Sequence, residues 1–258
     1  MNVSKFYGEL EKRYPGSLSC EWDNDGIMCS AGDICDVEKV LIALDPTEDA
    51  ITYAAEKGFD TVLTHHPLIF KKLGSVTPGS GVGRKIIFAL MNNISVISMH
   101  TRLDAGEGGV NDALSEALGL SDIEPFGDGE CPTMGRIGKL PEAMSGAEFA
   151  GFVKEKLGAA SVDFSLADDD DMIKKVAVVG GAGKDFIYPS KAAGADVLVT
   201  GEASYNALLD AAEDGVSVVT AGHFFTENLV CKKLKNLVNE ILPEAEVEVY
   251  FSNRIKNI

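Results

Sequence analysis

The sequence predicts an α/β protein made of two similar three-layer α/β domains, related to each other by a pseudo-twofold duplication. Three observations predict this fold class. Short apolar runs alternate with helical segments, which is typical of parallel strands covered by helices on both faces. A strand, helix and strand pattern that begins at Lys39 begins again at Lys175. The chain has 258 residues, 45% of them hydrophobic, so it is long enough to bury two cores.

The first copy of the pattern consists of three predicted strands joined by two predicted helices. The strands are expected over 39–43, 58–64 and 94–97, and the helices over 47–57 and 84–92. This order predicts consecutive βαβ units, whose strands lie parallel in one sheet.

The second copy repeats this plan with the same spacing. Its strands are expected over 175–179, 194–200 and 216–219. The first two are displaced along the chain from their counterparts by one and the same distance. A connecting helix of a different length would break this constant displacement, so the two halves are predicted to share one fold by duplication.

The boundary between the two domains is expected near Phe126. The segment 121–145 is rich in Gly, Pro and acidic residues, as connecting segments often are. A first α/β domain is therefore predicted over 1–126 and a second over 127–258.

Three further elements complete the predicted second half. A helix is expected over 146–157, a second helix over 226–241 and an edge strand over 247–251. The segment after about residue 223 has two open placements, on the second domain or back on the first.

Composition excludes several classes of partner. The net charge of −17 opposes binding to nucleic acid and to anionic membranes, since both carry negative charge. No apolar run approaches the roughly 20 residues that a membrane helix needs. The five cysteines are odd in number and form no Cys-x-x-Cys pair, so neither a disulfide framework nor a thiolate zinc site is predicted. These features predict a cytoplasmic protein.

All four histidines follow apolar, strand-like runs. His65 and His66 end the strand over 58–64, His100 follows the next predicted strand, and His223 follows the last one of the second copy. Ligands collect at the carboxyl ends of strands in open α/β sheets, so this clustering predicts one shared metal site. Adjacent residues that leave a strand point in opposite directions, and His65 and His66 are therefore predicted to serve two ions.

Two carboxylates are expected to join the imidazoles. His223 and Glu227 stand four residues apart at the start of a predicted helix, where they share one face and can meet one cation. Asp104 lies on a predicted loop before a helix over 108–118, and its carboxylate could bridge two cations. The role of His100 stays open between direct ligation and proton transfer from a position behind the ligands.

This donor set indicates the kind of ion and the kind of chemistry. Three imidazoles with two carboxylates suit Zn, Mn, Fe or Ni better than Ca or Mg. Two such ions per subunit, about 3.5 to 4 Å apart, lower the pKa of a bound water and favour hydrolysis. Glu202 occupies the position in the second copy that His66 occupies in the first. It is predicted either to line the substrate pocket or to be an exposed acid.

Eight short motifs, spread over nearly the whole chain, carry a family resemblance. They are Trp22-Asp23-Asn24-Asp25-Gly26, Leu44-Asp45-Pro46-Thr47-Glu48, Thr64-His65-His66-Pro67, His100-Thr101-Arg102-Leu103-Asp104, Gly108-Gly109-Val110-Asn111-Asp112, Gly135-Arg136-Ile137-Gly138, Thr200-Gly201-Glu202 and Gly222-His223-Phe224-Phe225-Thr226-Glu227. Taken together, they resemble the motifs of the NIF-three-like family of dinuclear-metal hexamers, often called GTP cyclohydrolase 1 type 2 homologues.

The resemblance implies a ligand set and an assembly. Glu227 would bridge the two ions and His100 would stay outside the ligand set. Two related α/β domains in each subunit and a ring-shaped homohexamer built from trimers are also implied. The family's metal ligands fall in this sequence on His65, His66, Asp104, His223 and Glu227.

Three positions depart from the usual family residues. Arg102 stands where an asparagine is usual, Pro46 interrupts the Leu-Asp-x-Thr motif, and Asn206 replaces a histidine usual after Thr-Gly-Glu. None of the three is a predicted ligand. Arg102 and Asn206 are therefore candidates, together with Glu202, for lining the substrate pocket.

Three functions fit these motifs. The leading hypothesis is a dinuclear metal-dependent hydrolase similar to a GTP cyclohydrolase, in which metal-activated water opens the imidazole ring of GTP and His100 carries a proton. The near competitor is a metal-dependent phosphohydrolase that uses the same centre. The third is a non-enzymatic metal-binding protein that acts through regulatory contacts with partners, since no other nucleophile motif is present.

Overall fold

The chain divides into two compact units. The computed structural model describes residues 1–33, 36–168, 170 and 172–255, so Cys35 lies outside the described residues. The first unit combines Met1–Leu103 with Val230–Arg254, and the second consists mainly of Asp104–Leu229. Each unit holds one sheet with helices, and the predicted α/β class is confirmed.

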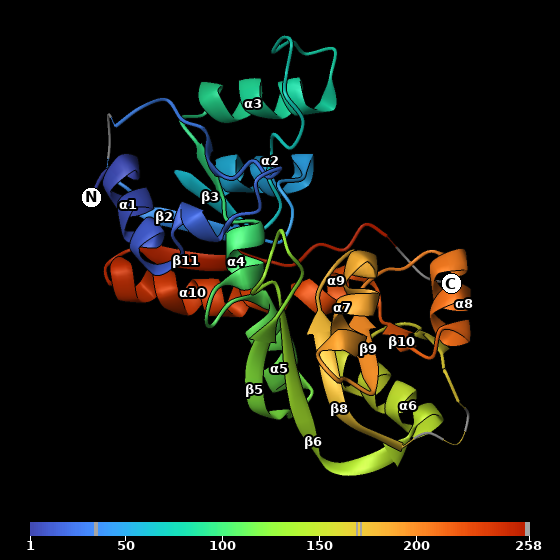
Figure 1. Ribbon diagram of the computed structural model, residues 1–258. Coiled ribbons are helices and arrows are strands. Elements are labelled where there is room, and N and C mark those ends of the chain that lie inside the picture. The colour runs from blue at the N-terminus through green and yellow to red at the C-terminus, as the bar shows by residue number, and fades with distance from the viewer. Residues whose placement is uncertain (34–35, 169, 171, 256–258) are drawn as a thin grey trace. The chain divides into compact units, whose positions relative to one another are not determined.

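The first unit is built on a five-stranded sheet in the order β1-β4-β3-β2-β11, of which Figure 1 labels β3, β2 and β11. β2, β3, β4 and β11 run parallel, and β1 pairs antiparallel with β4. The strands are β1 (Gly26–Cys29), β2 (Lys39–Ala43), β3 (Thr61–Thr64), β4 (Ser95–Ser98) and β11 (Glu246–Tyr250). The helices are α1 (Val3–Arg13), the short 3-10 helix η1 (Gly16–Leu18), α2 (Glu48–Lys57), α3 (Gly81–Met91), the start of α4 (Thr101–Ala105) and α10 (Val230–Ile241).

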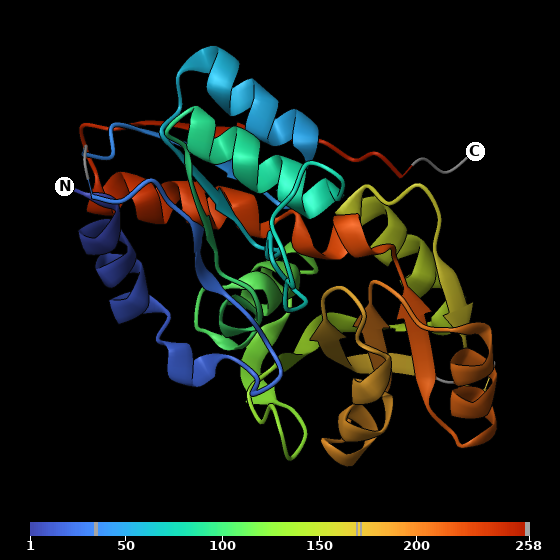
Figure 2. The ribbon, with the colours of Figure 1, turned by 90° about the horizontal axis from the view of Figure 1, so that it is seen from above.

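Helices cover both faces of this sheet. α2 and α3 lie side by side on one face (Figure 2), and α10 packs against β2 and β11 on the other. Leu41, Val62 and Val96, one from each central strand, share a core cluster with Ile51 of α2 and Ile86 of α3. Because side chains alternate along a strand, the neighbouring apolar residues point to the opposite face, where α10 covers β2 and β11, so the strands are apolar on both sides.

The second unit is built on a six-stranded sheet in the order β5-β6-β8-β9-β10-β7. β8, β9 and β10 run parallel, and the other pairs are antiparallel. The strands are β5 (Ser121–Phe126), β6 (Gly135–Ser145), β7 (Asp163–Ser165), β8 (Met172–Val179), β9 (Val197–Thr200) and β10 (Ser217–Thr220). The helices are α5 (Val110–Ala117), α6 (Gly146–Leu157), the 3-10 helix η2 (Lys184–Phe186), α7 (Ile187–Ala192), α8 (Tyr205–Glu213) and α9 (His223–Glu227).

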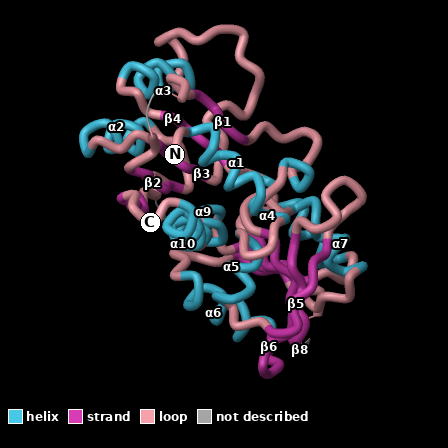
Figure 3. The backbone as a smooth tube through the Cα atoms, turned by 90° about the vertical axis from the view of Figure 1, so that its left-hand side faces the viewer, coloured by secondary structure: helices cyan, strands magenta, loops and turns pink. Residues whose placement is uncertain are grey.

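This second sheet is also covered on both faces. α5 and α6 lie on one side of β6 and β8, and α7 lies on the other (Figure 3). Leu114 of α5 and Phe149 of α6 share a core cluster with Val176, Val197 and Val219 of the three parallel strands. The three-layer arrangement predicted from the apolar runs is therefore present in each unit.

The duplication is visible in matching hydrogen bonds. In the first unit Oδ2 of Asp60 accepts from the backbone N–H of Lys39 at 2.8 Å, which ties the turn before β3 to the start of β2. In the second unit Oδ2 of Asp196 accepts from the N–H of Lys175 at 2.7 Å. Donor and acceptor are both displaced by the repeat spacing, so the two copies repeat one local structure.

The segment 121–145 differs from the linker that its composition suggests. It forms the antiparallel strands β5 and β6, and β6 continues into a long pairing with β8. β5 is exposed except at Phe126. An edge strand with little to bury lacks the apolar run that signals a strand, and its polar composition therefore resembles that of a loop.

The segment Val230–Arg254 belongs to the first unit. β11 pairs in parallel with β2, with Val247 opposite Val40, and α10 packs on the same strands. The units meet along the chain at Leu103–Asp104 and at Leu229–Val230, whereas the sequence predicted a single boundary near Phe126. Of the segment after about residue 223, the part up to Leu229 lies in the second unit and Val230–Arg254 lies in the first.

The cysteines also differ from expectation. Cys20 in the first unit and Cys131 in the second are disulfide-bonded, and Cys29 is a thiol. Cysteine count and spacing alone did not predict that Cys20 or Cys131 is disulfide-bonded. Within the part of the chain that the structure describes, no helix has the length and apolarity of a membrane span.

Candidate metal site

Three imidazoles gather at the carboxyl ends of β3 and β4 in the first unit. The ring centroids of His65 and His66 lie 4.8 Å apart. The ring centroid of His100 lies 5.3 Å from that of His65 and 5.8 Å from that of His66. One ring nitrogen of each residue lies within 4.8 Å of the other two, so the three could hold a metal ion. β3 and β4 are parallel neighbours, which brings the residues after both strands to one edge of the sheet.

The rings of His65 and His66 are both fixed through Nδ1. Nδ1 of His65 lies 3.1 Å from the carbonyl oxygen of Met99, and Nδ1 of His66 lies 2.7 Å from Oδ1 of Asp45. A carbonyl or an ionised carboxylate only accepts, so Nδ1 donates in each ring and the lone pair is on Nε2. This pattern is typical of histidines that bind metal through Nε2.

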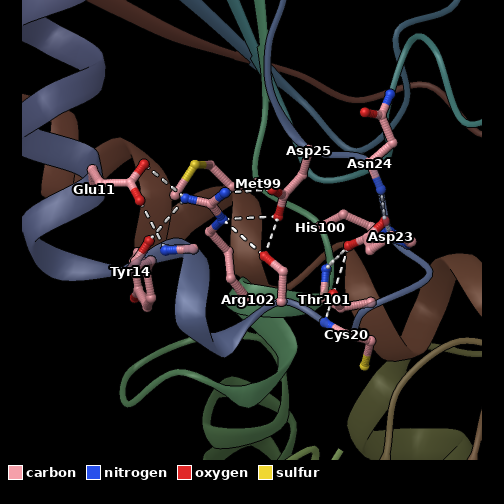
Figure 4. Close-up of polar contacts among 12 residues, drawn as sticks. Glu11, Tyr14, Cys20, Asp23, Asn24, Asp25, Met99, His100, Thr101 and Arg102 are labelled. Carbon is pink, nitrogen blue, oxygen red and sulfur yellow. Dashed lines mark hydrogen bonds and ion pairs between the residues drawn. The ribbon is translucent and has the colours of Figure 1, made fainter.

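His100 is held by a buried carboxylate (Figure 4). Its Nδ1 lies 2.6 Å from Oδ1 of Asp23, and Oδ2 of Asp23 accepts from the backbone N–H of Thr101 at 3.0 Å. Burial raises the pKa of Asp23, but the hydrogen bond and charge of His100, together with Thr101, outweigh this and lower the pKa from 3.8 to about 2. Asp23 is therefore ionised at neutral pH and orients the imidazole.

Arg102 follows His100 closely in sequence and has a structural role in the first unit. It is buried, and its guanidinium donates to Asp25 at 2.8 Å, to Glu11 at 3.0 Å and to the carbonyl of Tyr14 at 3.2 Å (Figure 4). Burial lowers the pKa of Arg102, but the bond and charge of Asp25 raise it above its ordinary value. These contacts join α1 and the loop before β1 to α4. The pocket role suggested for Arg102 stays a prediction.

The second unit pairs an imidazole with a carboxylate on α9. Nε2 of His223 lies 3.0 Å from Oε2 of Glu227, as the four-residue spacing predicts. One cation at about 2 Å from each atom fits this separation. Nδ1 of His223 lies 3.1 Å from Oε1 of Glu202, which follows β9. Glu202, singled out by its repeat position, thus orients a predicted ligand.

Glycines make room for these two side chains. A Cβ atom on Gly181 would lie 2.1 Å from Oε1 of Glu227 and 3.0 Å from Nε2 of His223. The backbone of Gly181 also has φ +64°, a conformation that favours glycine. A Cβ on Gly201 would lie 2.8 Å from the His223 Cα. The loops after β8 and β9 therefore approach α9 as closely as they do only because they carry glycine.

Asp104 lies in the short helix α4 rather than on the predicted loop. The helix begins with a tight turn in which the N–H of Leu103 donates to the carbonyl of His100 at 2.7 Å. Asn111 of α5 donates to the Asp104 carbonyl at 3.3 Å and accepts from the N–H of Gly180 at 2.8 Å. Asn111 thereby fixes the backbone that carries Asp104.

The predicted ligands come from both units. His65 and His66 belong to the first, whereas Asp104, His223 and Glu227 belong to the second. His65, Asp104 and Glu227 are buried. Buried carboxylates are costly unless charge or hydrogen bonds compensate them. The two imidazoles of the first unit, and the imidazole and two carboxylates of the second, are donors that fit a divalent cation. Asn206, a pocket candidate, is exposed on α8.

The family profile described as Duf34/NIF3 (NGG1p interacting factor 3) matches residues 1–258. This chain belongs to the Duf34/NIF3 family. The resemblance carried by the eight motifs is thereby confirmed. A "GTP cyclohydrolase 1 type 2 homolog" of Clostridium perfringens is 35% identical, covering 100% of this chain and 98% of the relative. A relative of the same name in Clostridium acetobutylicum is 34% identical, with 93% and 92% covered.

Solved structures extend the likeness to the fold. The crystal structure of a Staphylococcus aureus hypothetical protein has a TM-score of 0.91 and 27% identity, covering 100% of this chain and 99% of that one. Reduced HcgD from Methanocaldococcus jannaschii has a TM-score of 0.83 and 29% identity, with 96% and 97% covered. The Duf34/NIF3 fold therefore accounts for nearly the whole chain.

Sequence reasoning missed the groups that orient the imidazoles. Asp23 and Asp45 bond to His100 and His66, and the Met99 carbonyl bonds to His65. The two aspartates lie in motifs that this chain shares with the Duf34/NIF3 family. A carboxylate inside such a motif was the signal that could have identified them, and Asp45 also lies just after the carboxyl end of β2.

Proposed function

We propose that this Duf34/NIF3 protein is a dinuclear metal-dependent hydrolase. Its ligands would be those predicted from the sequence, with Glu227 as the bridging residue and two divalent ions of Zn, Mn, Fe or Ni in each subunit. One observation carries the proposal: Nδ1 of His65 and Nδ1 of His66 each face an oxygen acceptor. The Nε2 lone pair of both rings is therefore oriented for a cation.

The chain's own residues support this chemistry in distinct ways. Bound ions would supply a water of lowered pKa as the nucleophile. Asp45 and Glu202 keep the rings of His66 and His223 in place. His100, held by Asp23 next to His65 and His66, is the candidate proton carrier.

The proposed substrate is a purine nucleotide, with GTP as the first choice. Hydrolysis at C8 of the base would release formate and leave a ring-opened pyrimidine. Two relatives at 35% and 34% identity carry the name GTP cyclohydrolase 1 type 2 homolog, which supports this choice.

Metal analysis tests the ligand set. About two transition-metal ions per subunit are expected at saturation. His66→Ala and Glu227→Ala remove one ligand from each unit, and both should lower the ion content. Asn206→Ala changes an exposed residue of the second unit and serves as the control, which should keep the ion content of the wild type. A content near zero after loading at neutral pH would contradict the proposal.

Turnover assays separate the three candidate functions. Protein loaded with Mn or Zn is incubated with GTP. Formate with a ring-opened pyrimidine supports the cyclohydrolase, and free phosphate supports the phosphohydrolase. Absence of turnover across a substrate panel, in fully metal-loaded protein that still binds its partners, supports the regulatory metal-binding protein instead. A folded His66→Ala protein should lose turnover under either hydrolase.

We also propose a cytoplasmic homohexamer that binds neither membrane nor nucleic acid. The hexamer is proposed from the family resemblance. The absence of membrane and nucleic-acid binding is proposed from the net charge. Analytical ultracentrifugation should find the mass of six 27.4 kDa subunits. A stable monomer at micromolar concentration would contradict this assembly.

A further inference from the structure

Two exposed aromatic side chains stand beside the imidazole group of the first unit. Trp22 is 56% exposed and Phe70 is 48% exposed. Their ring centroids lie 6.2 Å apart with planes at 83°. The His100 ring lies 6.3 Å from Trp22 at 75° and 5.9 Å from Phe70 at 85°. These three rings, here called the aromatic corner, are nearly perpendicular to one another.

Hydrogen bonds hold the aromatic corner in place. The side-chain amide of Asn24 donates to the carbonyl of Ile69, so the loop that carries Trp22 is joined to the loop that carries Phe70. Asp23, next to Trp22, is anchored to His100 (Figure 4). A surface fixed before a ligand arrives loses less conformational entropy on binding. The two exposed rings are therefore pre-organised.

We infer that the aromatic corner binds the flat heteroaromatic base of a phosphorylated nucleotide. Aromatic rings prefer offset stacking or edge-to-face contact with centroids about 4.5 to 7 Å apart. Because the rings are perpendicular, a flat ligand that stacks on Trp22 presents its edge to Phe70. A base held there lies next to His100. The inference rests on the proposed function and names the residues that recognise the substrate.

Local charge favours a ligand that carries phosphate. Lys71 and Lys72 directly follow Phe70, and both are exposed. The chain as a whole has a net charge of −17 and would otherwise repel an anionic ligand. The exposed acid Glu21 precedes Trp22, so Lys71 and Lys72 are the sequence neighbours of the aromatic corner that would attract phosphate.

The single tryptophan of the chain makes the aromatic corner directly observable. Trp22 is that residue, so its fluorescence reports on this place alone, with or without metal. GTP and guanosine should change the emission with saturation. Ribose 5-phosphate and inorganic tripolyphosphate, which lack a base, should not. No saturable response to GTP at millimolar concentration would overturn the inference.

Substitutions test whether Phe70 contacts the base. Phe70→Ala should weaken GTP binding several-fold, up to about tenfold, the effect expected for loss of an edge-to-face aromatic contact. Phe70→Tyr keeps the ring and should restore binding. Phe251→Ala removes a ring that is 65% exposed in the same unit and should leave binding unchanged. Wild-type affinity in Phe70→Ala, or an equal loss in Phe251→Ala, would refute the inference.

Further measurements separate this inference from the proposed hydrolase. Lys71→Ala with Lys72→Ala should weaken binding of GTP but not of guanosine. A saturable Trp22 response without any hydrolysis supports the aromatic corner even though the hydrolase proposal fails. GTP hydrolysis with an unchanged KM in Phe70→Ala overturns the aromatic corner and keeps the hydrolase. A change of assembly mass in Phe70→Ala, with unchanged GTP affinity, would assign these rings to a subunit contact and also overturn it.

Discussion

The ends of β3 and β9 occupy equivalent places in the two units but carry different groups. His66 follows β3, and a carboxylate from elsewhere, Asp45, holds its ring. Glu202 follows β9 and holds a ring from elsewhere, that of His223 on α9. Each unit thus makes the same imidazole–carboxylate pair with the two roles exchanged. The duplicated scaffold determines where the pair lies, and the residue at each position determines which partner it supplies.

A second pair of positions explains how the exchange is accommodated. Asp45 and Gly181 are equivalent positions of the two copies, because they are separated by the repeat spacing that also separates Lys39 from Lys175. Position 45 carries the carboxylate that orients His66, whereas any side chain at position 181 would overlap Glu227. The second unit therefore has glycine where the first has an orienting acid.

The largest loss in the free energy of unfolding is expected for substitutions of the two buried arginines, Arg102 and Arg136. Arg102→Ala leaves Asp25, 4% exposed, without its guanidinium, and should lower the free energy of unfolding by about 3 to 5 kcal/mol. Arg136 of the second unit bonds Asp112 and the carbonyl of Ala105, so Arg136→Ala should cost a similar amount. Urea unfolding measures both. If Arg102→Ala keeps full stability but weakens substrate binding, Arg102 serves the pocket instead.

Gly181→Ala should have the next largest effect. Steric overlap with Glu227 and the positive φ together should cost about 2 to 4 kcal/mol and lower the metal affinity. Gly158→Ala is the matched control, because Gly158 has φ +61° but nothing within 4 Å of the added Cβ. The difference between the two variants in urea unfolding isolates the steric part. Equal losses would show that backbone conformation alone requires glycine at position 181.

Asp23→Asn tests the carboxylate that orients His100. The folded-state pKa of Asp23, about 2, lies below the ordinary 3.8, so the ionised carboxylate stabilises the folded state. This stabilisation is present above about pH 4 and is lost as the pH falls toward 2. At pH 7 the free energy of unfolding of the variant should be lower than that of the wild type by about 2 kcal/mol. This difference should close as the pH falls from about 4 toward 2. Unfolding at a series of pH values measures it. Asp45→Asn, at a side chain that is 42% exposed, should cost less because water screens the charge.

The smallest expected effect compares the starts of the crossover helices. Thr47 caps α2 by accepting from the N–H of Ala50 at 3.1 Å, whereas α7 in the second unit has no side-chain cap. Thr47→Ala should therefore cost about 1 kcal/mol in thermal or urea unfolding. Thr52→Ala, an exposed change within the same helix, should cost nothing measurable. A similar loss in both variants would argue against the cap.

Much of the fold could be predicted because strands buried on both faces need continuous apolar runs. The strand predicted over 39–43 is β2, and the helix predicted over 146–157 is α6, which begins at the Ser145 capping box and ends before Gly158. β5 was missed, since an exposed edge strand carries no such run. Local patterns thus identify the elements that bury their side chains and miss those that do not.

The candidate site likewise has contacts that local patterns predict and contacts that they do not. His223 and Glu227 could be paired from sequence because helix geometry brings residues four apart together. The partner of His100 could not, because Asp23 lies 77 residues away on a loop, where no periodicity indicates the direction of a side chain. Spacing thus predicts short-range donor pairs, and long-range orienting contacts require the folded chain.

By itself, the sequence determined the α/β class, the repeat and the placement of the histidines at strand ends. These properties depend on local periodicity and on distances along the chain. Only the tertiary structure decided which oxygen faces each imidazole Nδ1, that Arg102 joins buried segments, and that β11 extends the first sheet. These outcomes depend on packing between residues far apart in sequence, which no local pattern encodes.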